Sequence, residues 1–271
     1  MYYFNLYFIY FLIYSFLGWL WEEIFCTIDQ GKLVNRGFLF GPLCPIYGTG
    51  AIAVYVLFQD LMKIDNYIVL FFVSMAVCTV IEYVTAVILE KLFNTRWWDY
   101  SMYKINFQGR ISLLASTAFG AMSVILVKFI HPFVANLLSK IDHNVINFIG
   151  GICLGILIVD LILTVKSIIV MQSGLETVSR KLTEFLEQNK ERINSALAEG
   201  KTKTGEIKET LFKSFRRSKD YNEQMKKLKK PGIFSPKRLV RAFPSMKNTK
   251  YSKLFDTIKS DIEKDDENND E

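Results

Sequence analysis

Two glutamates in stretches almost free of other charges are the first candidates for chemistry. Glu22 shares one helical face with Ser15, Gly18 and Cys26. Glu82 lies on a similar face of small residues further along the chain. An ionised side chain at membrane depth costs about 2.5–3.5 kcal/mol or more. The spacing therefore predicts that both carboxylates point into a helix bundle or a wet cavity, where they would bind an ion, a proton or a polar substrate. Salt bridges that only fix the helix arrangement are the alternative.

The loops beyond these glutamates carry groups that can complement them. Arg36 and Arg110 are the expected counter-ions of the carboxylates, or they would hold an anion. Three further side chains add donors and acceptors on the same side of the membrane. We expect one substrate- or ion-binding site in the cytoplasmic half of the bilayer, formed by Glu22, Asn35, Arg36, Glu82, Asp99, Asn106 and Arg110.

A loop rich in glycine and proline lies between the two glutamates. Residues 31–50 hold 5 of the 15 glycines and 2 of the 6 prolines. Proline breaks a helix, and glycine permits tight turns and close backbone approach. The segment is either a re-entrant loop or a packed connecting turn. The residues expected to shape it are Gly37, Gly41, Pro42, Pro45 and Gly48.

Long apolar stretches must position these residues. A helix needs about 20 mainly apolar residues to cross a bilayer. Five such stretches are present, at residues 4–28, 44–62, 67–92, 111–131 and 146–171. Membrane barrels have short alternating segments instead. The sequence therefore predicts an all-α fold, namely a polytopic transmembrane helical bundle of about five spans followed by a cytoplasmic, partly helical basic tail.

Charge divides the 271 residues unevenly. Residues 1–171 hold 10 basic and 10 acidic residues, whereas residues 172–271 hold 23 basic and 17 acidic residues. This composition excludes a single soluble domain, a disulfide-framed secreted domain and a wholly disordered chain. We predict a transmembrane domain (1–171), an amphipathic cytoplasmic helix (172–200), a basic cytoplasmic tail (201–259) and an acidic disordered end (260–271).

The distribution of lysine and arginine predicts the orientation. Successive loops and termini alternate between few and many basic residues, with 2, 4 and 23 on one side and 0, 1 and 2 on the other. Basic residues accumulate on the cytoplasmic side. We therefore expect the N-terminus outside and the tail in the cytoplasm. There the basic tail would bind anionic lipid at about 1 kcal/mol per basic residue, or it would be solvated with no specific partner. A nucleic acid partner is not expected, because no recognition motif accompanies the charge.

Several motifs of other function classes are missing from the sequence. The four cysteines form no C-x-x-C pair, and the two histidines lack metal-site spacing. We therefore expect no metal and no cofactor. No G-x-x-x-x-G-K-[ST] motif for ATP and no nucleophile–His–acid set is present. The sequence therefore favours a protein that is not an enzyme, and any ATP hydrolysis would come from another chain.

A set of short motifs gives the sequence a family resemblance. The motifs are Gly18-Trp19-x-x-Glu22, Asn35-Arg36-Gly37-Phe38-Leu39-x-Gly41-Pro42-x-Cys44-Pro45-Ile46-Tyr47-Gly48, Glu82-Tyr83, Trp98-Asp99-Tyr100-Ser101, Asn106-x-x-Gly109-Arg110-Ile111 and, in the tail, residues 238–244. Together they resemble the family of bacterial membrane proteins labelled putative ABC-transporter type IV. The resemblance covers about residues 4–171 and the tail element. It implies a multi-pass protein of the bacterial cell membrane.

Three functions are compatible with these features. The first is a permease-like transport component with the polar cluster in the cytoplasmic half of its bundle, partnered by a separate ATPase subunit or a second copy. The second is a membrane enzyme that acts on a lipid or envelope precursor with its carboxylates and arginines. The third is a membrane scaffold or regulator that transports nothing. A cavity at the glutamates favours the first two, and a closed, dry bundle favours the third.

Overall fold

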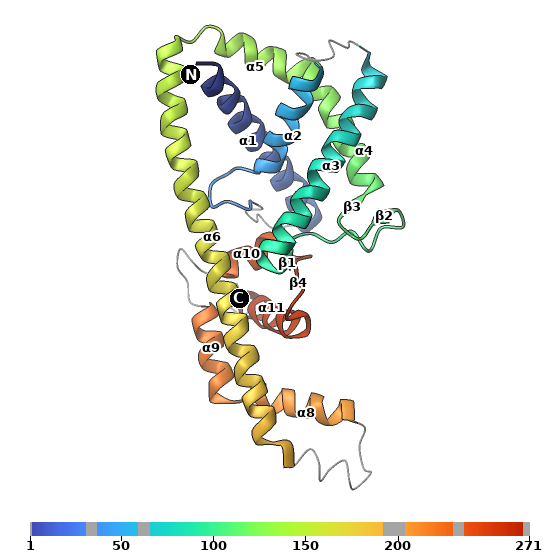
Figure 1. Ribbon diagram of the computed structural model, residues 1–271, viewed down its shortest axis with the longest axis vertical. Coiled ribbons are helices and arrows are strands. Elements are labelled where there is room, and N and C mark those ends of the chain that lie inside the picture. The colour runs from blue at the N-terminus through green and yellow to red at the C-terminus, as the bar shows by residue number, and fades with distance from the viewer. Residues whose placement is uncertain (1, 31–36, 59–65, 192–203, 230–235, 268–271) are drawn as a thin grey trace. The chain divides into compact units, whose positions relative to one another are not determined.

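The computed structural model describes residues 2–30, 37–58, 66–191, 204–229 and 236–267, and these are mainly helical (Figure 1). Asn35 and Arg36 lie outside the described residues. The chain divides into two compact units. Unit 1 is Met1–Thr164 with Arg241–Lys247, and unit 2 is Val165–Val240 with Asn248–Glu271.

Unit 1 is a bundle of apolar helices with short strands in one loop. α1 packs on α2, α2 on α3 and α3 on α4 (Figure 1). The strands β2 and β3 pair antiparallel, and β1 pairs with β4, whose first residue belongs to this unit. The elements are α1 (Tyr2–Gln30), α2 (Pro45–Tyr55), α3 (Tyr67–Phe93), β1 (Thr95–Arg96), β2 (Asn106–Phe107), β3 (Ile111–Ser112), α4 (Leu113–Ile125), the π-helical turn η2 (Leu126–Ile130), α5 (His131–Leu138), α6 (His143–Gln188) as far as Thr164, and β4 (Lys247–Asn248).

Polar residues set the ends of these helices. The Asn66 side chain accepts hydrogen bonds from the backbone N–H groups of Ile68 and Val69 and so caps the start of α3. Asn94 ends α3 in the left-handed conformation, with φ 46°. The Ser112 hydroxyl caps α4 by accepting from the backbone of Ala115. Asn94 and Ser112 thus mark the two ends of the loop that contains β1, β2 and β3.

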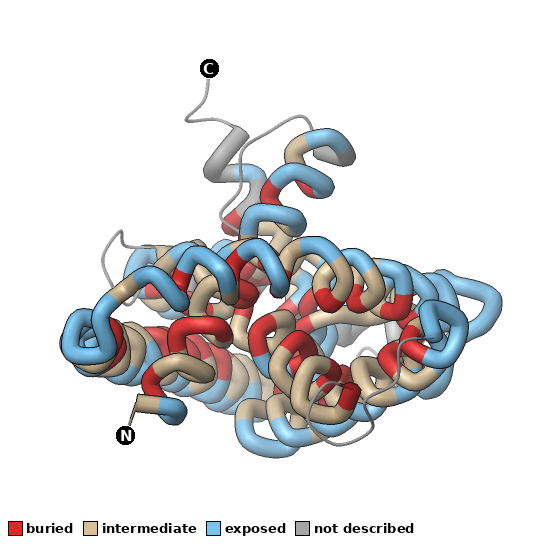
Figure 2. Tube along the Cα trace, turned by 90° about the horizontal axis from the view of Figure 1, so that it is seen from above, coloured by how far each residue is buried: buried red, intermediate tan, exposed pale blue. Residues whose placement is uncertain are grey.

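The hydropathy prediction of membrane-spanning helices is confirmed in its main part. Four helical segments are long and apolar enough to cross a membrane, at Tyr2–Ile28, Tyr67–Phe93, Leu113–Leu138 and His143–Gln188. Many of their large apolar side chains are exposed, and Figure 2 shows extensive exposed surface on the helices of the chain. Such surface suits lipid rather than water. The predicted stretch 44–62 contains the shorter apolar helix Pro45–Phe58, so the count of five spans stays a prediction.

Unit 2 is a helical unit with its own core. Its elements are the remainder of α6, α8 (Thr204–Arg216), α9 (Lys219–Lys229), α10 (Pro236–Ala242) up to Val240, and α11 (Ser252–Glu267). α6 runs on without a break to Gln188, as its amphipathic pattern predicts. Leu175 of α6, Phe215 of α8 and Phe255 of α11 are almost fully buried. These side chains supply the apolar interior that a folded unit needs.

The acidic end of the chain differs from the prediction of disorder. Its first residues, 260–267, belong to α11. Ile258 and Ile262 of this helix are buried, and the Asp261 carboxylate accepts a hydrogen bond from the Tyr221 hydroxyl at 2.6 Å and pairs with Arg216. Apolar residues four apart give the helix a buried face in spite of its negative charge.

Candidate functional site

A close contact between α1 and α2 positions the first glutamate. A Cβ atom on Gly18 would lie 2.3 Å from Cγ of Tyr47, so only glycine leaves room for this ring against α1. The Tyr47 hydroxyl then reaches one turn along α1 and donates to Glu22 Oε1 at 2.5 Å. In the Gly18-Trp19-x-x-Glu22 motif, Gly18 leaves room for the Tyr47 ring and Glu22 accepts the hydrogen bond from its hydroxyl.

The loop-shaping residues before and within α2 make this contact possible. The backbone N–H of Cys44 donates to the Ser15 carbonyl of α1 at 3.0 Å, and Pro45 begins α2. A Cβ atom on Gly48 would lie 2.2 Å from the Ser15 hydroxyl and 2.5 Å from the Phe11 carbonyl oxygen. Gly48 therefore permits the backbones of α1 and α2 to approach.

The second glutamate is bonded to another tyrosine. Glu82 of α3 is buried, with 3% of its surface exposed, and its Oε1 accepts from the Tyr100 hydroxyl at 3.0 Å. Its Oε2 has no hydrogen-bond partner among the described residues. A buried acceptor without a partner is unfavourable, because it has lost its hydrogen bonds to water. A ligand that donates a hydrogen bond to it would remove this cost.

The two glutamates act on the same tyrosine. Burial, followed by the charge of Glu82 and its hydrogen bond and then the charge of Glu22, raises the pKa of the Tyr100 hydroxyl. Tyr100 therefore remains protonated and serves as a donor. Within the described residues, no lysine or arginine forms an ion pair with either glutamate. This end of the bundle therefore combines two carboxylates with neutral donors.

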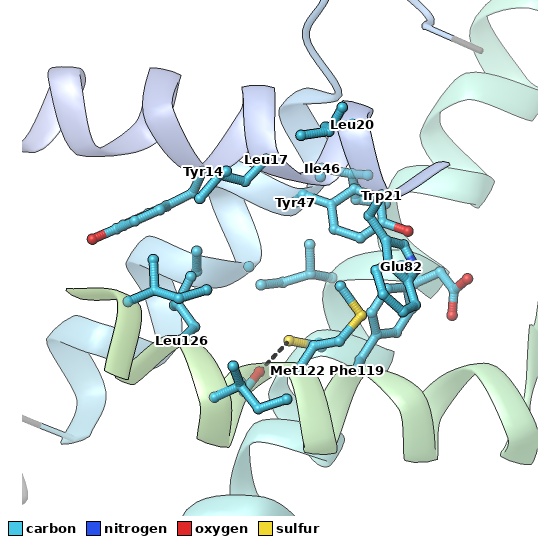
Figure 3. Close-up of a pocket in the computed structure, with 18 of the residues that line it drawn as sticks. Tyr14, Leu17, Leu20, Trp21, Ile46, Tyr47, Glu82, Phe119, Met122 and Leu126 are labelled. Atoms are coloured by element: carbon cyan, nitrogen blue, oxygen red, sulfur yellow. Dashed lines mark hydrogen bonds between the residues drawn. The ribbon is translucent and has the colours of Figure 1, made fainter. Parts of the chain in front are cut away.

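A cavity of about 370 Å³ leads away from Glu82 and Tyr47. Figure 3 shows Glu82, Tyr47 and Trp21 toward one side of it and Tyr14 and Leu126 toward the other. Most of its lining side chains are apolar, and they come from α1, α2, α3, α4 and η2. The cavity therefore joins an apolar interior to a polar end that bears a carboxylate.

Arg110 does not balance Glu82, so the expected pairing is wrong. Its guanidinium lies 2.9 Å from Glu90, two turns further along α3, and Arg96 lies 3.5 Å from the same carboxylate. The short β2–β3 hairpin places Arg110 next to the end of α3 rather than beside Glu82 deeper in the helix. Both arginines therefore hold residues 95–112, which we call the hairpin loop, to α3.

Asn106 and Asp99 are also engaged within the hairpin loop. The Asn106 side chain accepts from the Gly109 N–H at 2.9 Å and donates to the Tyr103 carbonyl at 2.7 Å. Asp99 accepts from the Ser101 backbone at 3.0 Å and from its hydroxyl at 2.6 Å. Gly109 has φ +68°, and a Cβ there would lie 2.6 Å from Asp99 Oδ1. These bonds shape the loop, so Asn106 and Asp99 do not share the hydrogen bonds of the two glutamates.

A short segment of the predicted tail belongs to unit 1 and contacts the hairpin loop. Phe243 packs edge-on against Trp97, with ring centroids 5.1 Å apart, and Trp97 is almost fully buried. Lys247 forms an ion pair with the Asp99 carboxylate. Burial would raise the pKa of Asp99, but the hydrogen bonds from Lys247 and Ser101 outweigh it and lower the pKa to about 2. We call residues 241–247 the return segment.

Asp160 of α6 fixes the glycine-rich loop. Its carboxylate accepts from the backbone N–H groups of Phe40 and Gly41, each at 2.7 Å, and from the Thr164 hydroxyl at 3.3 Å. A Cβ atom on Gly41 would lie 2.9 Å from Asp160 Oδ2, which explains why glycine suits this position. An aspartate inside an apolar helix is therefore used to anchor the loop that leads into α2.

A comparison with protein families gives this geometry a context. The model of the family described as "Putative ABC-transporter type IV" matches residues 9–165, more than half of the chain. The chain belongs to this family. The family match includes Glu22, Tyr47, Glu82 and Asp160 and ends before the return segment. No curated protein and no solved structure matches the chain.

For this type IV family member, the sequence missed the partners of its charged residues. Tyr47 and Tyr100 stand in the family motifs, but a tyrosine gives no sign of which acceptor it will reach. Asp160 is a charge inside an apolar stretch of sequence, which is the signal that could have marked it as a residue with a partner. No group of three or more metal-ligand side chains that could hold a metal ion is found where the structure describes the chain.

Proposed function

We propose that this chain is the permease-like membrane component of a transporter and that its substrate contacts the tyrosine-bonded glutamates. The observation that carries the proposal is the cavity that ends at Glu82, whose Oε2 is buried and unpaired within the described residues. Glu22 and Glu82 supply negative charge or proton exchange, and Tyr47 and Tyr100 supply neutral donors. The membership in the type IV family supports a role in transport.

A cavity at this position favours transport or lipid chemistry over a scaffold. A scaffold that works only through its surface needs no internal space beside a buried carboxylate. The Glu90 and Asp99 carboxylates, which lie near the arginines, are already paired with basic groups. That pairing leaves them no role in acid–base catalysis and weakens the enzyme hypothesis.

The proposed topology follows the distribution of basic residues. The N-terminus is outside, α2 and the segment after it form the second of five spans, and the predicted tail from residue 172 lies in the cytoplasm of a bacterial cell. The transmembrane domain of residues 1–171 carries the site. The basic region 201–259 lies on anionic lipid of the inner leaflet.

ATP hydrolysis comes from a separate subunit in this proposal, because the chain has no phosphate-binding loop. The test is to purify the complex from the host membrane and to measure ATP hydrolysis with and without this chain. We expect an ATPase subunit to co-purify and to hydrolyse ATP at a rate that depends on the chain. We expect Glu82→Gln to assemble normally but to change this dependence, because the variant loses the charge at the cavity.

An exposed carboxylate provides the matched control. The Glu187 side chain is 67% exposed and pairs with Lys190. Glu187→Gln should therefore behave as the wild type. The proposal fails if no ATPase associates with the chain, or if Glu82→Gln and Glu187→Gln are indistinguishable in a complex that assembles with normal yield.

A further inference from the structure

We infer that the cavity binds an amphiphile with an alkyl body and an ammonium head, which arrives from the lipid phase of the membrane. This inference names the substrate class of the site described above and so rests on the proposed function. It assigns the alkyl chain to the apolar part of the cavity and the ammonium to its polar end.

The apolar part of the cavity fits an alkyl chain. Its volume of about 370 Å³ falls at the lower end of the range for small-molecule sites, about 300–1,000 Å³. Between its two ends the lining is dominated by residues such as Leu17, Ile46, Met122 and Leu126. Polar groups of the lining are engaged in hydrogen bonds, for example Cys78 Sγ with Ser123 Oγ at 3.9 Å. A polar solute would lose its hydration there without replacement, whereas an alkyl chain would not.

The polar end of the cavity fits a cationic donor. Glu82 is 3% exposed, lines the cavity and has an oxygen without a partner in the described part of the chain. Glu22 adds a second negative charge that acts on the same tyrosine as Glu82 does. An ammonium carries three donors and one positive charge, so at the Glu82 end of the cavity it can offset the negative charge of the carboxylate.

The basic residues of the hairpin loop and the return segment that the structure describes near this site are already paired. Arg96 and Arg110 are bound by Glu90, and Lys247 is bound by Asp99. An amphiphile with a sulfate or phosphate head would therefore meet the Glu82 carboxylate without a free cation among these groups. Its head would be repelled where an ammonium head is attracted.

The cavity is lined in part by side chains that are exposed on the bundle surface. Leu20, Trp21, Ile24 and Ile125 line it and are between 38% and 52% exposed. They belong to two of the helical segments long enough to cross a membrane, so this surface faces lipid when the helices are inserted. A molecule dissolved in the bilayer can therefore reach the cavity from the side, without passing through water.

Trp21 offers a direct test because it lines the cavity. The purified chain in zwitterionic lipid nanodiscs is titrated with dodecylammonium that carries bromine on its chain, and tryptophan quenching is recorded. The same brominated chain with a sulfate head is the comparison. We expect saturable quenching by the ammonium that unbrominated dodecylammonium competes away and that Trp21→Phe removes, and only non-saturable quenching by the sulfate.

Two variants separately test the polar end of the cavity and the space for the alkyl chain. Glu82→Gln replaces a charged hydrogen bond by a neutral one and should weaken ammonium binding by about tenfold. Gly50 lines the cavity, so the side chain of Gly50→Val should fill part of it and abolish binding. The variant should still fold, because a Cβ at this position lies 3.4 Å from Cys78 Sγ, which is an ordinary contact. Glu187 is an exposed carboxylate outside the cavity lining, so Glu187→Gln should bind the ammonium as the wild type does. Size-exclusion profiles establish that each variant is folded.

Equal saturable binding of the ammonium and sulfate amphiphiles overturns the inference, and so does wild-type affinity in folded Glu82→Gln. If Glu82→Gln does not fold, Gly50→Val and the ammonium–sulfate comparison still decide the outcome. The proposed function is judged separately, by association with an ATPase and its activity. A chain that couples to an ATPase but ignores the ammonium amphiphile keeps the proposed function and loses this inference.

Discussion

The cavity and the hairpin loop surround their carboxylates with different partners. In and beside the loop, Glu90 faces two arginines and Asp99 faces Lys247. At the cavity, Glu22 and Glu82 accept hydrogen bonds from tyrosine hydroxyls. The first arrangement neutralises charge, whereas the second holds the carboxylates through hydrogen bonds from neutral groups.

This difference separates carboxylates that maintain the fold from carboxylates that remain available. Removal of one member of a buried ion pair leaves the other charge without compensation, which destabilises the protein. In a tyrosine–carboxylate hydrogen bond only the carboxylate can be charged. Replacing that carboxylate leaves no unpaired charge behind, so the loss of stability is smaller. Among the carboxylates we therefore expect a reversal: those of the hairpin loop matter most for stability, and those at the cavity matter most for function.

The largest effect on stability is expected where α1 and α2 touch at the cavity. Gly18→Ala should destabilise the protein by about 1–3 kcal/mol, because its Cβ would lie 2.3 Å from Cγ of Tyr47 and would push that ring away from Glu22. The measurement is the thermal unfolding midpoint in detergent. Gly155→Ala is the matched control, since nothing lies within 4 Å of a Cβ at that position of α6. Equal midpoints for the two variants would show that the close packing at Gly18 is unimportant.

A pair of substitutions on α3 tests the comparison directly. Glu90→Gln should cost about 1–2 kcal/mol, because Arg96 and Arg110 lose their carboxylate and all three side chains are less than one quarter exposed. Glu82→Gln should change stability by less than about 1 kcal/mol, because the amide oxygen still accepts from Tyr100. Urea unfolding of both variants in the same detergent measures the difference. A Glu82→Gln variant as unstable as Glu90→Gln would contradict the distinction between the two regions.

The smallest effect concerns Asp99 and depends on pH. Its pKa is lowered from 3.8 to about 2, so the folded state favours the ionised form. The stability that it contributes is complete above about pH 4 and is lost as the pH falls through about 2. Because Phe243 packs on Trp97, we expect Trp97 fluorescence to change over this interval when Lys247 loses its partner. Asp99→Asn should lack this acid transition; a transition of the same size in that variant would assign it to another group.

The sequence predicted the helices better than it predicted their partners. Hydropathy located the long apolar helices because each needs only its own composition to be recognised. The spacing of Gly18 and Glu22 also placed both on one face of α1, and Tyr47 lies on that face. These are properties of single helices, which a single sequence carries in full.

Pairings across the fold were not accessible in the same way. Arg110 is nearer in sequence to Glu90 than to Glu82, but only the turn at Gln108 and Gly109, both with positive φ, brings it to Glu90. Likewise, nothing in the spacing indicates that Asp160 accepts from Phe40 and Gly41, about 120 residues away. Such contacts depend on how helices pack, which composition does not encode.

The return segment has a consequence for the order in which the protein is made. Residues 241–247 belong to the same unit as residues 1–164, although some 75 residues of another unit are synthesised between them. Until the ribosome has passed Lys247, Trp97 lacks Phe243 and Asp99 lacks its lysine. The bundle is therefore synthesised first and completed late, and a chain that ends before residue 241 lacks one of the aromatic partners of Trp97 and the lysine that pairs with Asp99.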